Sequence, residues 1–534
     1  MSAFPISLDQ APFQNSFADA LRADPSRELQ PRQVPGYHYS PVQPTHVKDP
    51  HLLAWSEELA AELGLQRPPE RGPAVEVLAG NRVLPSMRPF AARYGGHQFG
   101  NWAGQLGDGR AIGLGELTAP DGSAWEIQLK GAGPTPYSRR ADGRAVLRSS
   151  LREFLCSEAM HYLGVPTTRA LSLVGTGELV VRDMFYSGNP QPEPGAVVAR
   201  VAPSFVRFGN FQIFAATGEI EQLRELTDYV VGRFYPELGP PSADVYVRFF
   251  GEVARRTAVM VAHWMTVGFV HGVMNTDNMS ILGLTIDYGP YGWLEPYQPD
   301  WTPNTTDFAT HRYAFGQQPR VALWNLMMLA QALSPLVADV QALRPALDEY
   351  VRIFTATRNA QLRRKLGLTR QAELDDAPLL DSLQEALAAA EVDMTVFFRR
   401  LAHEVPALLT RPAEADEALE ALLTAAAYPE SSAEGLRQLR EWLGRYLERL
   451  RQEPADAAST GAAMLAANPK YVLRNYLAAQ AIEAAEAGDL APLNRLFEVL
   501  KRPFDEQPEH DDLAAKRPEW ARDKPGSATL SCSS

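Results

Sequence analysis

The stretch His271-Gly-Val-Met-Asn-Thr-Asp277-Asn278, followed nine residues later by Asp287-Tyr-Gly289, decides how this chain is interpreted. It comes directly after an apolar segment, residues 258–267, that is predicted to be helical. Asn278 and Asp287 offer hard oxygen donors, which suit Mg²⁺ or Mn²⁺ rather than Zn²⁺. Asp277 is the one carboxylate inside the first loop. The two loops therefore predict a metal-dependent site with Asp277 beside it.

The spacing within these loops is that of a protein kinase catalytic loop with one group moved. A kinase places an Asp base two residues after the His and a metal-binding Asn seven residues after it, and an Asp-Phe-Gly motif follows. Here Asn278 stands at the expected distance from His271, and Asp287 takes the place of the second metal ligand. Val273 occupies the position of the base and cannot accept a proton. His271 is typical of a histidine that braces the loop. The pattern predicts a nucleotide and metal site whose base has been displaced.

A lysine that could pair with phosphates lies upstream. Alternating apolar residues predict a strand over Trp125–Lys130, which places Lys130 at its end. A helix is predicted over residues 145–163, and Glu153 lies beside its apolar stripe. A Lys–Glu ion pair in this position holds the lysine for the phosphates in kinases. Glu158 on the same helix is the alternative partner.

Glycine and arginine are concentrated around this lysine. Residues 104–116 contain five glycines, which would allow backbone N–H groups to approach phosphates but would equally suit a hairpin turn. From Lys130 to Arg207 there are ten Lys or Arg against six Asp or Glu. Arg200 and Arg207 add guanidinium groups, which bind phosphate oxygens in pairs. This local positive charge suits a nucleotide, whereas the net charge of −13 for the whole chain argues against a nucleic-acid partner.

The composition and element order predict a fold class of α+β, specifically a protein kinase-like two-lobed fold with an N-terminal arm and a C-terminal helical extension. Apolar residues at helical spacing predict helices at residues 379–390, 436–450 and 471–487 of that extension. The predicted regions are an N-terminal arm packed on the body (1–75), a nucleotide-binding N-lobe (76–215), a C-lobe with the catalytic and metal loops (216–360), a helical extension (361–502) and a tail with Cys532 (503–534).

The remaining composition points to the cytoplasm. Cys156 and Cys532 are the two cysteines, so a disulfide framework is excluded. The first residues show no basic segment followed by an apolar run, and no stretch reaches the ~20 apolar residues of a membrane span. We therefore expect a cytoplasmic protein with no membrane partner.

Long motifs along nearly the whole chain resemble the selenoprotein O family of kinase-like protein adenylyltransferases, in a bacterial form with cysteine. The matching stretches are Tyr94-Gly-Gly-His-Gln-Phe-Gly-Asn-Trp-Ala-Gly-Gln-Leu-Gly-Asp-Gly-Arg110, Lys130-Gly-Ala-Gly133, Tyr137-Ser-Arg139, Asp142-Gly-Arg-Ala-Val-Leu-Arg-Ser149, Ser157-Glu-Ala-Met-His-Tyr-Leu-Gly164, Arg200-Val-Ala-Pro-Ser204, His271-Gly-Val-Met-Asn-Thr-Asp-Asn-Met-Ser280, Asn468-Pro-Lys-Tyr-Val-Leu-Arg-Asn-Tyr476 and Ser531-Cys-Ser-Ser534.

The resemblance implies an ATP molecule that lies reversed relative to ordinary kinases, so that AMP passes to a Ser, Thr or Tyr hydroxyl of a protein substrate and pyrophosphate leaves. It implies a metal-dependent enzyme with ATP and protein substrates as partners and with Mg²⁺ or Mn²⁺ as the cofactor. We expect a monomer. The residue roles that it implies are a base (Asp277), metal ligands (Asn278 and Asp287), phosphate-binding cations (Lys130, Arg200 and Arg207), a carboxylate that fixes Lys130 (Glu153) and further nucleotide contacts (Gly107, Gly109, Arg110, Asp142 and Gly143). The alternatives are a kinase that transfers the γ-phosphoryl group and a non-catalytic nucleotide-binding scaffold.

One departure from the family concerns redox control. Many members carry selenocysteine near the end of the chain, where this sequence has Cys532, and members with redox control bridge it to a cysteine near the active site. The stretch from Asp287 to Asp307 contains no cysteine. Cys156 lies on the predicted Glu153 helix, where we expect it to be buried packing. The sequence therefore does not supply the partner that a regulatory disulfide would need.

Overall fold

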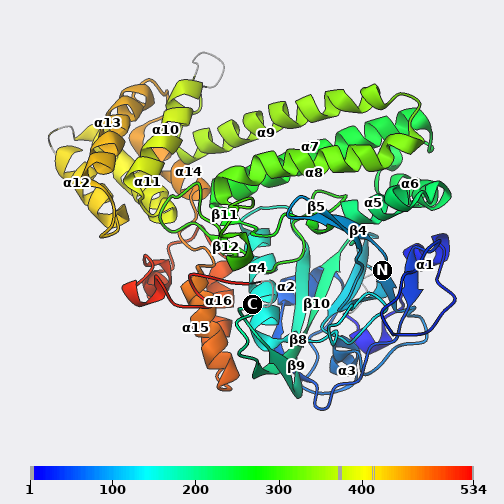
Figure 1. Cartoon of the computed structure of the whole chain (residues 1–534). Helices are drawn as coiled ribbons and strands as arrows, with labels where there is room; N and C mark the ends of the chain where they lie inside the picture. The colour runs from blue at the N-terminus through cyan, green and yellow to red at the C-terminus, as the bar shows by residue number, and fades with distance from the viewer. Residues whose placement is uncertain (1–4, 371–375, 412, 414, 532–534) are drawn as a thin grey trace.

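The computed structural model describes residues 5–370, 376–411, 413 and 415–531, and it combines an antiparallel sheet with many helices (Figure 1). This confirms the mixed α and β content that the sequence predicts. The main sheet has the strand order β1-β3-β6-β7-β10-β9-β2, and β8 pairs with β10. Its strands are β1 (Tyr39–Pro41), β2 (His51–Trp55), β3 (Phe90–Ala92), β6 (Ala111–Thr118), β7 (Ala124–Lys130), β8 (Ala145–Val146), β9 (Arg169–Arg182) and β10 (Gln191–Ala202).

The register of β7 decides which side chains reach the site. Because side chains alternate along a strand, Ile127 and Leu129 point to one face of the sheet, where both are completely buried. Gln128 and Lys130 point to the opposite face. The neighbouring strand β10 places Arg200 directly opposite Gln128. One face of the central strands therefore gathers polar and charged groups.

Helices cover both faces of the sheet. On the face of Ile127 and Leu129, the helices α2 (Glu57–Glu62) and α3 (Pro73–Ala79) contribute to the same apolar cluster. The helix α4 (Leu147–Tyr162) packs on the opposite face, within a second apolar cluster. This helix begins two residues later than predicted, because residues 145 and 146 form β8 instead.

Three long helices lie side by side beyond the sheet (Figure 1). They are α7 (Ala243–Val267), α8 (Gln318–Leu333) and α9 (Arg344–Lys365). The side chain of Ser242 caps the start of α7 by accepting a hydrogen bond from the amide of Val245, and Gly268 ends the helix with a φ of +76°. This ending directs the chain into the loop that begins at His271. The short helices before α7 are α1 (Ser16–Ala20), α5 (Phe208–Thr217) and α6 (Ile220–Phe234).

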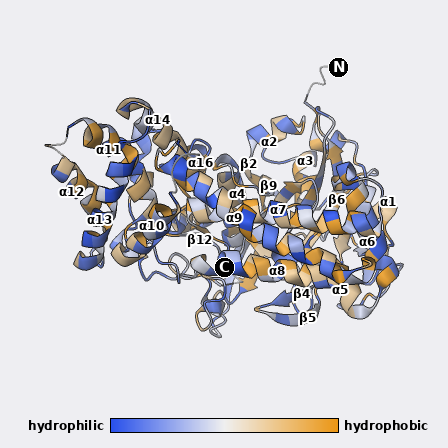
Figure 2. Cartoon of the chain, turned by 90° about the horizontal axis from the view of Figure 1, so that it is seen from above, coloured by the Kyte–Doolittle hydropathy of each residue, from blue (hydrophilic) through white to orange (hydrophobic). Residues whose placement is uncertain are grey.

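The C-terminal region is helical, as the sequence predicts. Figure 2 shows α11, α12 and α13 at one end of the molecule, away from the sheet. Two helices from the end of the chain pack instead against α4. The helices are α10 (Ala377–Ala390), α11 (Met394–Thr410), α12 (Ala415–Ala426), α13 (Ala433–Leu450), α14 (Ala457–Ala467), α15 (Asn475–Glu486) and α16 (Ala491–Leu500). Within the described ranges, no helix has both the length and the apolar character that crossing a bilayer demands.

Two small strand pairs frame the loops that carry the motif. The strand β11 (Phe269–Val270) pairs with β12 (Gly292–Trp293), so the chain between them leaves and returns at one place. This excursion contains both His271 and Asp287. The second pair is the hairpin of β4 (Gly95–Gln98) and β5 (Asn101–Gln105), which contacts the short helical turn Thr276–Asn278.

Candidate active site

Lys130 and Glu153 form the ion pair that the sequence predicts. Lys130 Nζ lies 2.6 Å from Glu153 Oε2, and the Glu153 side chain is only 2% exposed. Burial lowers the pKa of Lys130, although the nearby Glu153 charge opposes this change. The alternative partner, Glu158, is engaged elsewhere, because it accepts hydrogen bonds from Arg169 at 2.7 and 2.8 Å. The geometry therefore selects Glu153.

Two arginines hold the carboxylate of Asp287. Arg200 pairs with Oδ1 of Asp287 and Arg207 pairs with Oδ2. Arg200 also donates to Glu153 Oε1 at 3.1 Å, so the two acidic residues share one guanidinium. Burial disfavours the charged form of Asp287, but Arg207 and Arg200 nevertheless hold its pKa well below the ordinary value. Asp287 is therefore an ionised carboxylate within a buried cationic cluster.

Asp277 lies in the same cluster with one oxygen free. Its side chain is buried, and Gln98 Nε2 donates to Oδ2 at 3.3 Å. Within the described part of the chain, Oδ1 is buried without any hydrogen-bond partner. Burial raises the pKa of this carboxyl to about 6. Arg207 Nη1 donates to the main-chain oxygen of Asp277 at 3.0 Å, which fixes the loop beside Asp287.

The side chain of Asn278 uses its amide nitrogen within the loop, so its amide oxygen is the atom that could bind a metal ion. Its Nδ2 donates to the main-chain oxygen of Val273 at 2.8 Å, which leaves Oδ1 to face away from that contact. His271 braces the same loop as predicted, because its Nε2 lies 2.9 Å from the main-chain oxygen of Ile286 and its ring is buried. Val273 is buried and apolar.

The glycines near β6 are required by close packing. Gly107 has a φ of +116°, and a Cβ there would lie 2.4 Å from the ring of Tyr137. A Cβ on Gly109 would lie 2.9 Å from the main-chain oxygen of Tyr137. Arg110 follows them, and burial lowers its pKa. Among the described residues, no carboxylate lies within ion-pair distance of Arg110, so its guanidinium is available to a ligand.

Asp142 and Gly143 lie in the loop that precedes β8. Both carboxylate oxygens of Asp142 are taken by Arg182, at 2.7 and 2.8 Å, and nearly half of the side chain is exposed. Gly143 has a φ of +71°, and a Cβ there would overlap the backbone of Gly133. These two residues therefore shape the loop, and they do not join the ion-pair network around Asp287.

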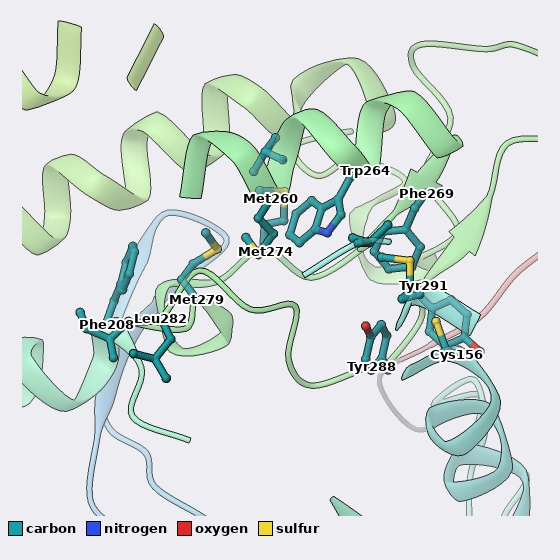
Figure 3. Packing of buried hydrophobic residues seen from close by; sticks show 14 of the residues in the cluster. Cys156, Phe208, Met260, Trp264, Phe269, Met274, Met279, Leu282, Tyr288 and Tyr291 are labelled. Atoms are coloured by element: carbon teal, nitrogen blue, oxygen red, sulfur yellow. The ribbon is translucent and has the colours of Figure 1, made fainter. Parts of the chain in front are cut away.

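Cys156 is buried packing, as predicted. It is completely buried on α4 and lies against Tyr288 and Tyr291 (Figure 3). Cys532 lies outside the described residues. The chain just before it runs beside the loop that follows the site, because Leu530 exchanges hydrogen bonds of 2.8 and 2.9 Å with Thr305 and Pro303.

Several residues of the cluster carry no sequence signal of their own. Gln128 accepts from Arg200 and donates to Asp108 at 3.3 Å, and Asp108 lies 3.9 Å from Arg207. Gln98 is another example. Gln128, Asp108 and Gln98 all reach the cluster through contacts between distant parts of the chain. Gln98 and Asp108 do belong to the long motif Tyr94–Arg110, but nothing in that motif indicates these contacts.

Comparison with known proteins identifies relatives along nearly the whole chain. The sequence model of the family described as "Protein adenylyltransferase SelO" matches residues 28–501. A protein of Nitrosospira multiformis named "Protein nucleotidyltransferase YdiU" is 57% identical over 551 residues, which cover 99% of this chain and 97% of that protein. Proteins of the same name from Azoarcus sp. and Xanthomonas campestris pv. campestris are 57% and 55% identical, and each alignment covers 98% of this chain and 99% of the relative.

These findings define the chain as an enzyme of the nucleotidyltransferase class. The chain belongs to the protein adenylyltransferase SelO family. Membership of an adenylyltransferase family makes ATP the donor substrate.

Proposed function

We propose that the chain forms two kinase-like lobes around the Asp287 cluster, with residues 76–215 as the N-lobe and residues 216–360 as the C-lobe. This proposal is supported by the order along the chain of a strand lysine, a helix glutamate and an aspartate loop that contact one another. Lys130 ends a strand and pairs with Glu153 on the helix that covers the sheet. The loop with Asp287 returns to meet both through Arg200. The arm before residue 76 and the helices after residue 360 would then be additions to these lobes.

The reaction proposed is transfer of AMP from ATP to a Ser, Thr or Tyr hydroxyl of a protein substrate. The observation that carries this proposal is the place of the free acceptor oxygen. Val273 fills the position of a kinase base with an apolar side chain, whereas Asp277 Oδ1 is buried and lacks a hydrogen-bond partner among the described residues. Compared with a kinase, the base lies further along the loop, at Asp277 instead of position 273. This suits a reaction at the α-phosphorus, which would lie in a different place from the γ-phosphorus of a kinase.

Asp277 is the general base in this proposal. As the substrate oxygen forms its bond to the α-phosphorus, its proton passes to Asp277 Oδ1. The bond from the α-phosphorus to the bridging oxygen breaks, and the electron pair leaves with pyrophosphate. Lys130, Arg200 and Arg207 would neutralise the leaving group, because their fixed charges need no reorganisation in a buried site. Glu153 holds two of these cations in place.

The residues present also fit a divalent metal ion. Asp287 offers an ionised carboxylate and Asn278 offers an amide oxygen, which are hard donors of the kind that Mg²⁺ and Mn²⁺ prefer. In the described ranges, no cluster of three His, Cys, Asp or Glu side chains could hold a metal by itself. This suits an ion that binds through one carboxylate and the phosphates of ATP. When bound, it would supply positive charge to those phosphates. Each oxygen of Asp287 keeps a further lone pair for the ion beside its bond to Arg200 or Arg207.

The products distinguish this reaction from phosphorylation. Incubation with ATP and a protein substrate should release pyrophosphate in step with AMP bound to protein, and Asp277→Asn should suppress both. Release of ADP in step with modified protein would contradict the proposal, because it would mean that the γ-phosphoryl group had moved.

A further inference from the structure

The β4–β5 hairpin packs directly against the loop that carries Asp277. The main-chain amide of His97 donates to Thr276 Oγ1 at 2.7 Å. At the tip of the hairpin, the amide of Phe99 donates to the hydroxyl of Tyr313 at 2.8 Å, and that hydroxyl donates to Asn275 at 2.6 Å. The hairpin is therefore fixed to the two residues that directly precede Asp277.

Close backbone approach leaves Asp277 little freedom. A Cβ on Gly96 would lie 2.5 Å from Asp277 Oδ1 and 2.9 Å from its Cβ. Gly209 of α5 also contacts this residue, because a Cβ there would lie 3.4 Å from Asp277 Cα. Real Cβ contacts are essentially never as short as 2.5 Å, so a larger residue at position 96 would push the carboxylate aside.

The two oxygens of Asp277 have different environments because of this hairpin. Gln98 Nε2 donates to Oδ2 at 3.3 Å, whereas Oδ1 has no partner in the described part of the chain. An amide donor on one oxygen fixes the rotation of the carboxylate and leaves the lone pairs of the other oxygen to accept a proton.

We propose that the β4–β5 hairpin positions the catalytic base, with Gln98 as the positioning residue that holds Asp277 through Oδ2 and Gly96 as the space that Oδ1 requires. This inference rests on the proposed function, in which Asp277 receives the proton. Gln98 remains on Oδ2 while the hydroxyl proton moves to Oδ1, the new oxygen–phosphorus bond forms and pyrophosphate departs. Gln98 acts through Asp277 in this inference and has no assigned contact with ATP or the hydroxyl.

The first test separates positioning from nucleotide binding. Gln98→Ala should lower kcat for AMP transfer by about 10²-fold, the typical cost of a misplaced reacting group, and should change the KM for ATP by no more than about twofold. Gln66→Ala replaces an exposed glutamine away from the site and should leave both constants unchanged. A variant Gln98→Ala with unchanged kcat would overturn the inference, and so would a loss that appears only in the KM for ATP.

The second test fills the space beside Asp277 and does not replace Gln98. Gly96→Ala should lower kcat to a similar extent, while ATP should still raise the unfolding temperature as it does for the unchanged protein. Gly251→Ala is the matched control, because nothing lies within 4 Å of a Cβ at that position in α7. Full activity of Gly96→Ala would overturn the inference.

A third variant distinguishes the failure of this inference from the failure of the proposed function. If Asp277→Asn keeps full activity, Asp277 is not the base, and the proposed function itself is wrong at that point. If Asp277→Asn is inactive but Gln98→Ala and Gly96→Ala are fully active, only the positioning role is wrong. In the Asp277→Asn background, Gln98→Ala should cause no further loss, because residues that act as a unit are not additive.

Discussion

Lys130 and Glu153 form an ion pair of 2.6 Å at the boundary between the sheet and α4, with side-chain exposures of 12% and 2%. The second oxygen of Glu153 accepts from Arg200, so one carboxylate orients two cations that reach the site from β7 and β10. Without Glu153, these cations would face each other in a buried space. The pair therefore stabilises the fold, and in the proposed reaction it would hold both cations for the phosphates of ATP.

Lys130→Ala should abolish AMP transfer, with a loss of at least about 10²-fold, because it removes a fixed positive charge from the leaving group. The initial rate of label transfer from ATP to protein measures this loss. Lys48→Ala removes an exposed lysine and should behave as the unchanged protein. Normal transfer by Lys130→Ala would refute the role of Lys130.

Glu153→Gln and Glu158→Gln should have different effects, although both residues are buried on α4. Glu158 binds Arg169 and Ser56, so its loss should destabilise the fold by about 3–5 kcal/mol without changing the KM for ATP. Glu153→Gln should also destabilise the fold, but unlike Glu158→Gln it should raise the KM for ATP and lower kcat. Thermal unfolding and steady-state kinetics on both variants check this, and equal kinetic defects would contradict it.

The sequence predicts the main parts of the site but not how they meet. Lys130, Asn278 and Asp287 follow from local spacing, because each stands in a short motif. The choice between Glu153 and Glu158 stays open at the sequence level, since both fit the same helix. It is decided by Arg169, which strand β9 brings to Glu158. Pairing between distant segments carries no local signal.

The ion pairs of Asp287 and the packing of the β4–β5 hairpin against Asp277 also join distant segments. The sequence therefore does not predict them. Arg200 and Arg207 are predicted to bind phosphates, and the structure adds that both bind Asp287, which no spacing in the sequence indicates. The motif around Gln98 is prominent in the sequence, but its contact with Asp277 joins residues 179 positions apart. Glycine density near Gly107 suits either a phosphate loop or a hairpin turn, and the structure adds that Gly107 makes room for the ring of Tyr137.

Removal of divalent metal ions should stop AMP transfer without weakening the nucleotide-free fold. In the proposed site, Asp287 and Asn278 supply two protein donors, so we expect the ion to complete its coordination with the phosphates of ATP. Treatment with EDTA should abolish activity, and Mg²⁺ or Mn²⁺ should restore it. The unfolding temperature measured without ATP should stay the same. A large fall in that temperature would mean that a structural metal site exists.

Lys365 should make stability depend on pH. It is buried at the end of α9, donates to the main-chain oxygen of Thr266 at 3.0 Å, and burial lowers its pKa from 10.5 to about 7. Between these two values the unfolded chain binds a proton that the folded chain does not. The contribution of Lys365 to the free energy of unfolding therefore becomes more favourable as the pH increases from about 7 towards 10.5. The loss of folding stability that the burial of Lys365 causes is largest below pH 7.

Lys365→Met should remove this dependence, because methionine fills similar space without a charge. Urea unfolding at pH 7 and pH 9 gives the change in unfolding free energy for each protein. The unchanged protein should gain more stability between the two pH values than Lys365→Met does. Equal gains would show that Lys365 stays charged in the folded state.

The central claim is that the site transfers AMP, and the fate of the two ends of ATP tests it most directly. The enzyme is incubated with a protein substrate and with ATP labelled on either the α- or the γ-phosphate, alongside Asp277→Asn. We predict that the α-label becomes bound to protein, that the γ-label leaves as pyrophosphate, and that Asp277→Asn shows neither. Protein that carries the γ-label and not the α-label would contradict the account.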